Sequence, residues 1–212
     1  ETVPNPAWDL VDIKPYQDKW ALHKHPFTIN VATTRGCPYK CNWCAKPIYG
    51  NRYNSRSPKR VVQELKWLTK EFNTTNVWMC DDIFGLKPNW VQEFRDELNK
   101  EGLAIKYKIQ SRADLLLKED NIDALVQSGL NEVWIGAESG SQKILDAMDK
   151  GTSLEQIKKS TELLQSKGVR VAYFLQFGYL GETKEDILKT IDMLLTNMPV
   201  SYTHLRAHET EA

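Results

Sequence analysis

The 212-residue sequence lacks an excess of charge of either sign, because 28 lysines and arginines balance 28 aspartates and glutamates. The whole-chain field therefore does not favour nucleic acid or an anionic membrane as a partner. No run of eighteen apolar residues is present, so the sequence predicts no transmembrane helix. No basic segment followed by an apolar one opens the chain as a signal peptide does. The first residue is Glu1 rather than Met, which suggests a piece of a longer protein.

Cysteine is scarce, and its distribution excludes a disulfide framework. The chain has only four cysteines, and three of them fall within the eight residues Cys37–Cys44. A secreted disulfide scaffold has an even number of cysteines spread along the chain. The distribution therefore predicts a reducing, cytoplasmic compartment.

The three clustered cysteines, Cys37, Cys41 and Cys44, have the spacing C-x3-C-x2-C. Three thiolates this close together hold three irons of a cubic [4Fe–4S] cluster and leave the fourth iron without a protein ligand. An open metal position makes a metal site a place of chemistry, as it does at catalytic zinc. A zinc knuckle is the alternative, but structural zinc takes four ligands. The nearest histidines, His23 and His25, lie upstream at an unusual separation.

Strands and helices alternate along most of the chain. Residues 1–26 hold four prolines without hydrophobic periodicity, which indicates an extended arm or linker. The strands expected after it are 27–34, 76–80, 105–109, 132–137 and 169–177. Helix starts are expected at Ser57–Pro58, at Pro88 and at the capping boxes Thr152–Glu155 and Thr183–Asp186. This alternation predicts an α/β core over residues 27–199, with a parallel sheet and helices outside it.

Residues 200–212 fit nothing before them. A sixth strand is due here, yet the stretch is mostly polar and is similar to a translated adapter tail. We expect that it is not native and that the barrel stops after its fifth β/α unit; ordered pairing in the sheet would count against this. His204 and His208 have the i, i+4 spacing of a metal pair, an interpretation that we do not favour.

Polar groups follow four consecutive strands, and the carboxyl ends of parallel strands are where ligands bind. The groups are Asp81–Asp82, Ser111–Arg112, Glu138–Gly140 and Gln176–Glu182. Structural alternatives remain open for most of them. The aspartates can cap a helix, Arg112 can pair with Asp114 or Glu119, and Glu138 can begin a helix turn. Gln176 is expected to point into the barrel beside Ala172 and Phe174, where it needs a partner. Cys80 is interpreted as a small buried apolar residue.

The chain resembles the radical SAM superfamily, whose core is a partial (β/α)6 TIM-like barrel. The cysteine spacing carries this resemblance. A narrower similarity, to the subgroup with an N-terminal cobalamin-binding domain, rests on Pro6-Ala-Trp-Asp9, Arg35-Gly-Cys37, Cys80-Asp-Asp-Ile-Phe84, Gly136-Ala-Glu-Ser-Gly140 and Gly178-Tyr-Leu-Gly-Glu-Thr183. Leu180 stands where the last motif usually has proline, and the cobalamin signature Asp-x-His-x-x-Gly is absent. Cobalamin would therefore need a domain outside this chain, to which residues 1–26 would lead.

The resemblance implies a role for each candidate residue. Cys37, Cys41 and Cys44 would ligate iron, and Tyr39 or Trp43 would shield the cluster or stack on adenine. S-adenosylmethionine would be held at its ammonium by Asp81 or Asp82, at its carboxylate by Arg112, and at its ribose by Glu138 with Ser139 nearby. Gln176 would reach the ribose or the carboxylate.

The resemblance also implies a reaction. One electron from the cluster cleaves S-adenosylmethionine and starts a methylation, cyclisation or rearrangement of a small organic substrate. A one-electron donor such as flavodoxin or ferredoxin is then a partner. The alternatives are a cobalamin-independent tRNA methylthiolase and a non-catalytic zinc- or cluster-binding module. Residues 35–60 hold seven basic residues and no acidic one, which indicates compensation of thiolate charge or a solvated loop; RNA binding is not expected.

Overall fold

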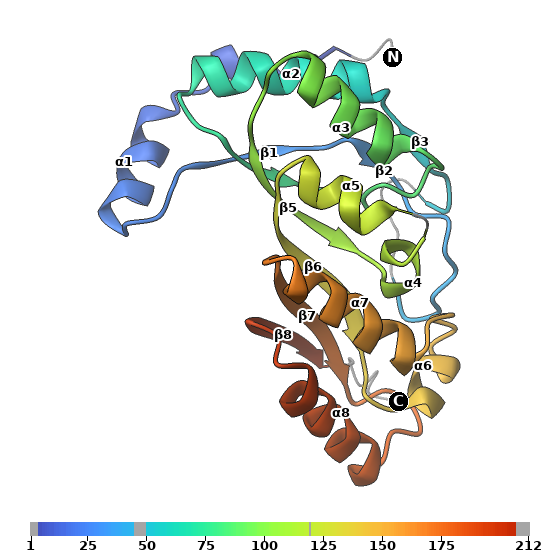
Figure 1. The fold of residues 1–212 in the computed structure, drawn as a ribbon. Helices are drawn as coiled ribbons and strands as arrows, with labels where there is room; N and C mark the ends of the chain where they lie inside the picture. The colour runs from blue at the N-terminus through green and yellow to red at the C-terminus, as the bar shows by residue number, and fades with distance from the viewer. Residues whose placement is uncertain (1–3, 45–49, 119, 207–212) are drawn as a thin grey trace.

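The computed structural model describes residues 4–44, 50–118 and 120–206. A six-stranded parallel sheet has the order β1-β4-β5-β6-β7-β8. Its strands are β1 (Thr28–Val31), β4 (Asn76–Met79), β5 (Lys106–Ser111), β6 (Leu130–Glu138), β7 (Arg170–Phe177) and β8 (Ser201–Arg206). The sheet is curved like part of a barrel, with the larger helices along its outer side (Figure 1). The predicted α/β fold with five β/α units is confirmed.

The helices that cover the sheet follow their strands in chain order. They are α2 (Pro58–Glu71), α3 (Trp90–Lys100), α4 (Ala113–Leu116), α5 (Asn121–Gln127), α6 (Gln142–Ala147), α7 (Leu154–Ser166) and α8 (Lys184–Asn197). Alternate strand residues face them: the Tyr107 hydroxyl lies 2.7 Å from Ser128 Oγ, after α5, and the Tyr173 hydroxyl lies 2.6 Å from Thr161 Oγ1 of α7. The neighbouring residues on these strands therefore face the inner side of the sheet. In the described part of the chain, no helix is long and apolar enough to cross a membrane.

Local capping signals set the helix starts. Ser57 caps α2 and accepts a hydrogen bond from the Arg60 amide, as predicted. The capping box at Thr183 and Asp186 is also confirmed. The box expected at Thr152–Glu155 lies one residue later, at Ser153 and Gln156. Gln156 Oε1 accepts from the Ser153 amide at 2.9 Å, so the amide side chain performs the role expected of a glutamate.

The N-terminal arm is partly helical, whereas the sequence predicted an extended segment. It contains a 3-10 turn, η1 (Trp8–Leu10), and a helix, α1 (Lys14–Leu22). The helix buries none of its residues. Its sequence therefore lacks the periodic apolar residues from which an amphipathic helix is predicted. The arm is nevertheless docked, because Trp8 packs on Phe72 with ring centroids 6.1 Å apart and Gln17 Nε2 donates to Phe72 O at 2.9 Å. Its link to a cobalamin-binding domain stays a prediction.

A sixth strand is present where a non-native tail was expected. β8 pairs with β7 in parallel register, from Ala172 with Ser201 to Phe177 with Arg206. The free edge of β7 offers unpaired backbone groups, which a polar segment can satisfy without burying its side chains; Ser201 to His204 are exposed. Because such backbone pairing requires no particular side chains, the non-native origin of residues 200–212 stays a prediction. Residues 207–212, with His208, lie outside the described residues.

Candidate active site

The cysteine loop lies at the carboxyl end of β1, as predicted. It leaves the sheet through a short antiparallel ribbon of β2 (Thr34–Arg35) and β3 (Asn54–Ser55). Cys37, Cys41 and Cys44 are not in disulfides and are partly exposed.

Asn42 attaches the cysteine loop to the segment after α6. Its amide N–H donates to Met148 O at 3.1 Å, and its Nδ2 donates to Ala147 O at 2.7 Å. The hydroxyl of Tyr179, after β7, lies 2.6 Å from Asn42 Oδ1. These three bonds tie Asn42, between Cys41 and Cys44, to the end of α6 and to the segment after β7. Sequence reasoning missed Asn42 and Tyr179, because no local pattern links residues this far apart.

We predict that Asn42→Ala loosens the cysteine loop without unfolding the domain. The change removes two side-chain hydrogen bonds, each contributing about 0.5–1.5 kcal/mol net. Hydrogen exchange of the amides in residues 37–44 should accelerate several-fold, while the exchange of β5 and β6 stays the same. Asn51→Ala, an exposed position of the same loop, is the matched control. Equal exchange in both variants would show that Asn42 does not hold the loop.

Arg112 lies beside the cysteine loop and is almost fully buried. Its Nε pairs with Asp114 Oδ1 at 2.9 Å, and its Nη2 donates to Lys150 O at 2.7 Å. The guanidinium stacks on the Tyr39 ring, 3.8 Å from its centroid, and Nη1 lies 3.8 Å from Cys41 Sγ. The alternative pairing with Asp114 is therefore present. The same cation lies against Cys41 Sγ, where it would offset the negative charge of a thiolate ligand.

Glu138 forms a buried ion pair that the sequence did not predict. Lys150 Nζ lies 2.8 Å from Glu138 Oε1, and the two side chains are only 7% and 5% exposed. Glu138 has a φ of 60°, a conformation that is costly for a residue other than glycine and that collects at functional sites. Lys150 Nζ also lies 5.9 Å from the Trp43 ring centroid. A Cβ on Gly136 would lie 2.7 Å from Lys150 Nζ and 2.8 Å from Glu138 Oε1, so a side chain there would displace the charged ends of this pair.

Asp81 holds the corner between β1 and β2 instead of capping a helix. Its Oδ1 accepts from the backbone amides of Thr33 at 2.7 Å and Thr34 at 2.9 Å, and its Oδ2 accepts from the Thr33 hydroxyl. Burial raises the pKa of this carboxyl from 3.8 to about 6, against the opposing effect of these hydrogen bonds. Both oxygens are engaged within the protein. Asp82 is exposed.

The raised pKa of Asp81 predicts a pH-dependent stability. Between pH 3.8 and about 6 the folded state keeps a proton that the unfolded state has lost. The free energy of unfolding should therefore fall as the pH rises through this window, by on the order of 1.4 kcal/mol per unit of pKa shift. Asp81→Asn keeps an oxygen for both amides and should remove this contribution. Urea denaturation from pH 4 to 7 measures it; identical slopes in the two proteins would contradict the prediction.

Gln176 and Ser139 differ in whether their side chains have hydrogen-bond partners. Gln176 is 7% exposed, and its Oε1 is buried without a hydrogen-bond partner among the described residues. A buried acceptor without a donor is costly, so a bound ligand is its expected partner. Ser139 is already engaged: its Oγ accepts from the Ser141 amide at 3.1 Å and lies 3.3 Å from Thr190 Oγ1.

The inner face of the sheet carries aromatic and cationic side chains that sequence reasoning did not single out. Lys108 Nζ lies 4.1 Å from the Trp78 ring centroid, and Trp134 packs against Phe174 at 4.9 Å. Cys80, predicted to be buried, is exposed, because it follows β4 at the open end of this face. These side chains lie on the side of the sheet opposite Tyr107 and Tyr173, which face the helices.

The donor set of the loop fits an iron–sulfur cluster. Three thiols on one loop are the soft ligands that such clusters take, and Arg112 would offset their charge. Within the described residues, no three histidine, cysteine, aspartate or glutamate side chains are gathered closely enough to hold a metal ion. Cluster loading therefore requires the loop to bring its sulfur atoms together. A structural zinc site would need a fourth ligand besides the three cysteines. The two histidines considered for this role, His23 and His25, are exposed just after α1.

Known proteins are similar to this chain in sequence. Residues 31–194 match the radical SAM superfamily. The chain is 29% identical over 192 residues to an uncharacterized methyltransferase of Pyrococcus horikoshii, covering 90% of this chain and 40% of that protein. It is 30% identical over 160 residues to the anaerobic magnesium-protoporphyrin IX monomethyl ester cyclase of Rubrivivax gelatinosus, covering 75% and 29%. The chain thus spans less than half the length of these relatives.

Solved structures share the fold. The cobalamin-dependent S-adenosylmethionine radical enzyme OxsB, with aqua-cobalamin and S-adenosylmethionine bound, has a TM-score of 0.74 at 25% identity, covering 92% of this chain and 29% of OxsB. The radical S-adenosylmethionine methyltransferase TsrM from Kitasatospora setae has a TM-score of 0.78 at 20% identity, covering 92% and 37%. The second likeness concerns the fold alone.

Proposed function

Because the chain belongs to the radical SAM superfamily, we propose that its cysteine loop binds a [4Fe–4S] cluster and S-adenosylmethionine and starts radical chemistry on a small organic substrate. When bound, the cluster supplies the single electron that cleaves S-adenosylmethionine. The observation that carries this proposal is the cysteine loop itself. Its three thiols lie at the carboxyl end of a parallel sheet, and Asn42 and Arg112 attach that loop to the ends of α6 and β5.

The contacts of each candidate residue refine the proposed roles in S-adenosylmethionine binding. Asp82 is the better candidate for the methionyl ammonium, since both oxygens of Asp81 are engaged. The ion pair of Glu138 uses Oε1, so Oε2 would accept a hydrogen bond from a ribose hydroxyl. Gln176 Oε1 would accept a hydrogen bond from the ligand. Arg112 would meet the methionyl carboxylate with the part of its guanidinium that faces the cysteine loop.

The relatives favour methylation or cyclisation as the reaction. The curated relatives include methyltransferases and cyclases, and OxsB is described as cobalamin-dependent. A cobalamin-associated enzyme is therefore favoured over a tRNA methylthiolase, with cobalamin held outside this chain. The inner wall of Trp78, Lys108, Trp134 and Phe174 suits an organic substrate that packs against aromatic rings. A one-electron donor such as flavodoxin or ferredoxin and a cytoplasmic setting complete the proposal.

Anaerobic iron–sulfur reconstitution of the 212-residue chain tests this function. The reduced protein should show a cluster signal in electron paramagnetic resonance that changes when S-adenosylmethionine is added, and dithionite should then yield 5′-deoxyadenosine. S-adenosylhomocysteine, a neutral thioether without the sulfonium centre that one electron cleaves, is the matched ligand control and should give no such product. A chain that takes up zinc but no iron, or a cluster that S-adenosylmethionine leaves unchanged, would favour the non-catalytic alternative.

A further inference from the structure

Four side chains form a charged row across the inner face of the sheet. They are register partners on neighbouring strands: Trp78 pairs with Lys108, Lys108 with Glu132, and Glu132 with Arg170. Register partners in parallel strands project from the same side of a sheet. The sheet curves toward this side, whereas the larger helices lie along the other (Figure 1). The row therefore lies on the concave face, with two cations beside one carboxylate.

The carboxylate of this row is engaged by other donors. Glu132 Oε1 accepts from Trp134 Nε1 at 2.8 Å, and Glu132 Oε2 lies 3.3 Å from Arg170 Nε. Asp81, the acidic residue just after Cys80 at the end of β4, is engaged at the β1–β2 corner. In the part of the chain that the structure describes, the ammonium group on β5 therefore has no acidic partner.

Lys108 and Trp78 present two kinds of hydrogen-bond donor side by side. Lys108 is half-buried, and its Nζ lies 4.1 Å from the centroid of the Trp78 ring. This contact offsets the charge only in part, because an ammonium group has three N–H donors and the ring face is a weak acceptor. Trp78 Nε1 is buried and has no hydrogen-bond partner among the described residues. An anionic oxygen of a ligand would supply an acceptor to both groups.

Aromatic rings lie beside the charged row, nearer the carboxyl ends of the strands. Trp134 of β6 and Phe174 of β7 are half-buried, and their ring centroids lie 4.9 Å apart with an interplanar angle of 35°. Each follows a member of the row, Glu132 or Arg170, further along its own strand. The rings are therefore on the side of the row toward the cysteine loop. Such rings pack well against a flat ligand.

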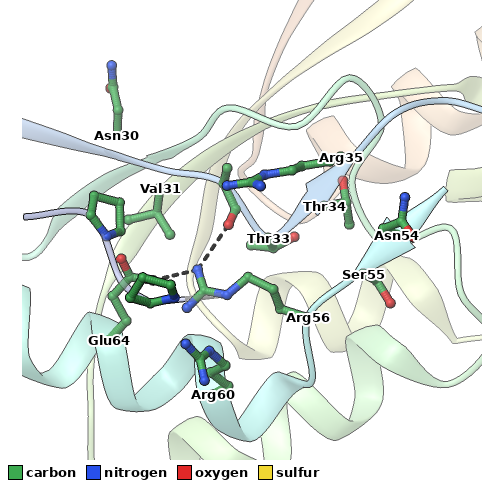
Figure 2. A pocket seen from close by; sticks show the side chains of 13 residues that line it. Asn30, Val31, Thr33, Thr34, Arg35, Asn54, Ser55, Arg56, Arg60 and Glu64 are labelled. Atoms are coloured by element: carbon green, nitrogen blue, oxygen red, sulfur yellow. Dashed lines mark hydrogen bonds and ion pairs between the residues drawn. The ribbon is translucent and has the colours of Figure 1, made fainter. Parts of the chain in front are cut away.

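The arginines beside the N-terminal arm differ from Lys108. A cavity of about 460 Å³ lies between the arm, the end of β1 and the start of α2, and three arginines line it. Arg56 pairs there with Glu64 (Figure 2), and Arg35 and Arg60 also have interactions within the protein. The charges of this cavity are thus engaged in the fold. The cation on the inner face is the better candidate for ligand binding.

We propose that the substrate is a flat organic acid, whose carboxylate or phosphate group binds Lys108 and Trp78 Nε1 and whose ring system packs on Trp134 and Phe174. The inference rests on the proposed function, since it names the substrate of the same site. Lysine binds either acid group as a point charge, and the rings select for a planar shape. The ring system, rather than the acid group, is then directed toward the cysteine loop.

Calorimetric titration of the 212-residue chain, without iron or S-adenosylmethionine, tests this inference with three probes. 2-Naphthoate and 2-naphthyl phosphate carry the two acid groups on one flat ring system, and 2-naphthalenemethanol is the neutral control. At least one anion should bind about tenfold more tightly than the alcohol, as expected for a hydrogen bond to a charged group. The tighter anion identifies the acid group. Equal affinity for the alcohol, or no binding of either anion, would overturn the inference.

Matched variants locate the binding. Lys108→Met keeps the length of the side chain and should weaken the tighter anion about tenfold. Lys159→Met removes the same charge from an exposed position of α7, on the other side of the sheet, and should weaken it less than twofold. Trp78→Phe keeps a ring beside the lysine but removes the N–H, and should weaken the anion several-fold. Equal losses in the two lysine variants would place the binding elsewhere.

Indole N–H resonances of the unmodified chain locate the ligand even where a variant folds poorly. Saturation with the tighter anion should shift the signals of Trp78 and Trp134. The signal of Trp67, an exposed tryptophan of α2, should stay unchanged. Shifts confined to other tryptophans would refute the site.

The two proposals fail separately, because the titration needs neither iron nor S-adenosylmethionine. A chain that binds the anion at the inner face but gives no 5′-deoxyadenosine after reconstitution contradicts the proposed function and leaves the binding site intact. A chain that gives 5′-deoxyadenosine but does not distinguish the anions from the alcohol contradicts this inference alone.

Discussion

Alanine in place of Cys37, Cys41 or Cys44 should reduce the yield of 5′-deoxyadenosine from S-adenosylmethionine at least about 100-fold. Loss of an outer-shell partner of a metal already costs roughly 10- to 100-fold in affinity or activity, and these changes remove a ligand itself. Two thiols cannot hold three irons, so iron content per chain should fall together with activity.

Cys80→Ala is the matched control for these variants. The fourth cysteine is also not in a disulfide, but it follows β4 and lies outside the cysteine loop. Its replacement should leave iron content unchanged, as measured by iron and sulfide analysis after anaerobic reconstitution. If Cys41→Ala retained the iron and the S-adenosylmethionine-dependent signal of the unmodified chain, the proposed function would fail.

Lys150→Met should lower the free energy of unfolding by about 3–5 kcal/mol, because it leaves a buried carboxylate without its counter-charge. Glu138 is 5% exposed in the pair, and water cannot replace the lost ammonium group there. The double variant Glu138→Gln/Lys150→Met should recover most of this loss, since removing both charges of a buried pair is often close to neutral. Urea denaturation of the single and double variants measures the coupling.

A surface pair supplies the control for this cycle. Lys66 pairs with Glu101 at 2.7 Å, but the lysine side chain is 59% exposed. Lys66→Met should therefore cost less than about 1 kcal/mol. A loss in Lys150→Met no larger than in Lys66→Met would show that Glu138 is not confined as the structure indicates. A double variant as unstable as the single one would show that the loss comes from packing rather than charge.

Some features of the candidate site were predicted from the sequence, and others were missed. The cysteine loop was placed correctly, because it follows a recognisable strand and parallel strands end at one edge. The inward direction of Gln176 followed from the alternation of side chains along β7. The partner of Glu138 was missed, since Lys150 lies in a loop with no periodicity. Asp81 was expected to meet a ligand, but the β1–β2 corner turns the Thr33 and Thr34 amides toward it.

The sequence by itself determined the order of five β/α units, the caps of α2 and α8, and the position of three thiols after the first strand. These features depend on signals within a few residues: side-chain alternation, helical spacing and capping side chains. Only the tertiary structure decided that Tyr179 contacts Asn42, that Lys150 pairs with Glu138, and that the arm and α2 line a common cavity. Contacts of this kind join loops far apart in the chain, and their geometry is set by how the curved sheet places its strand ends rather than by local preference.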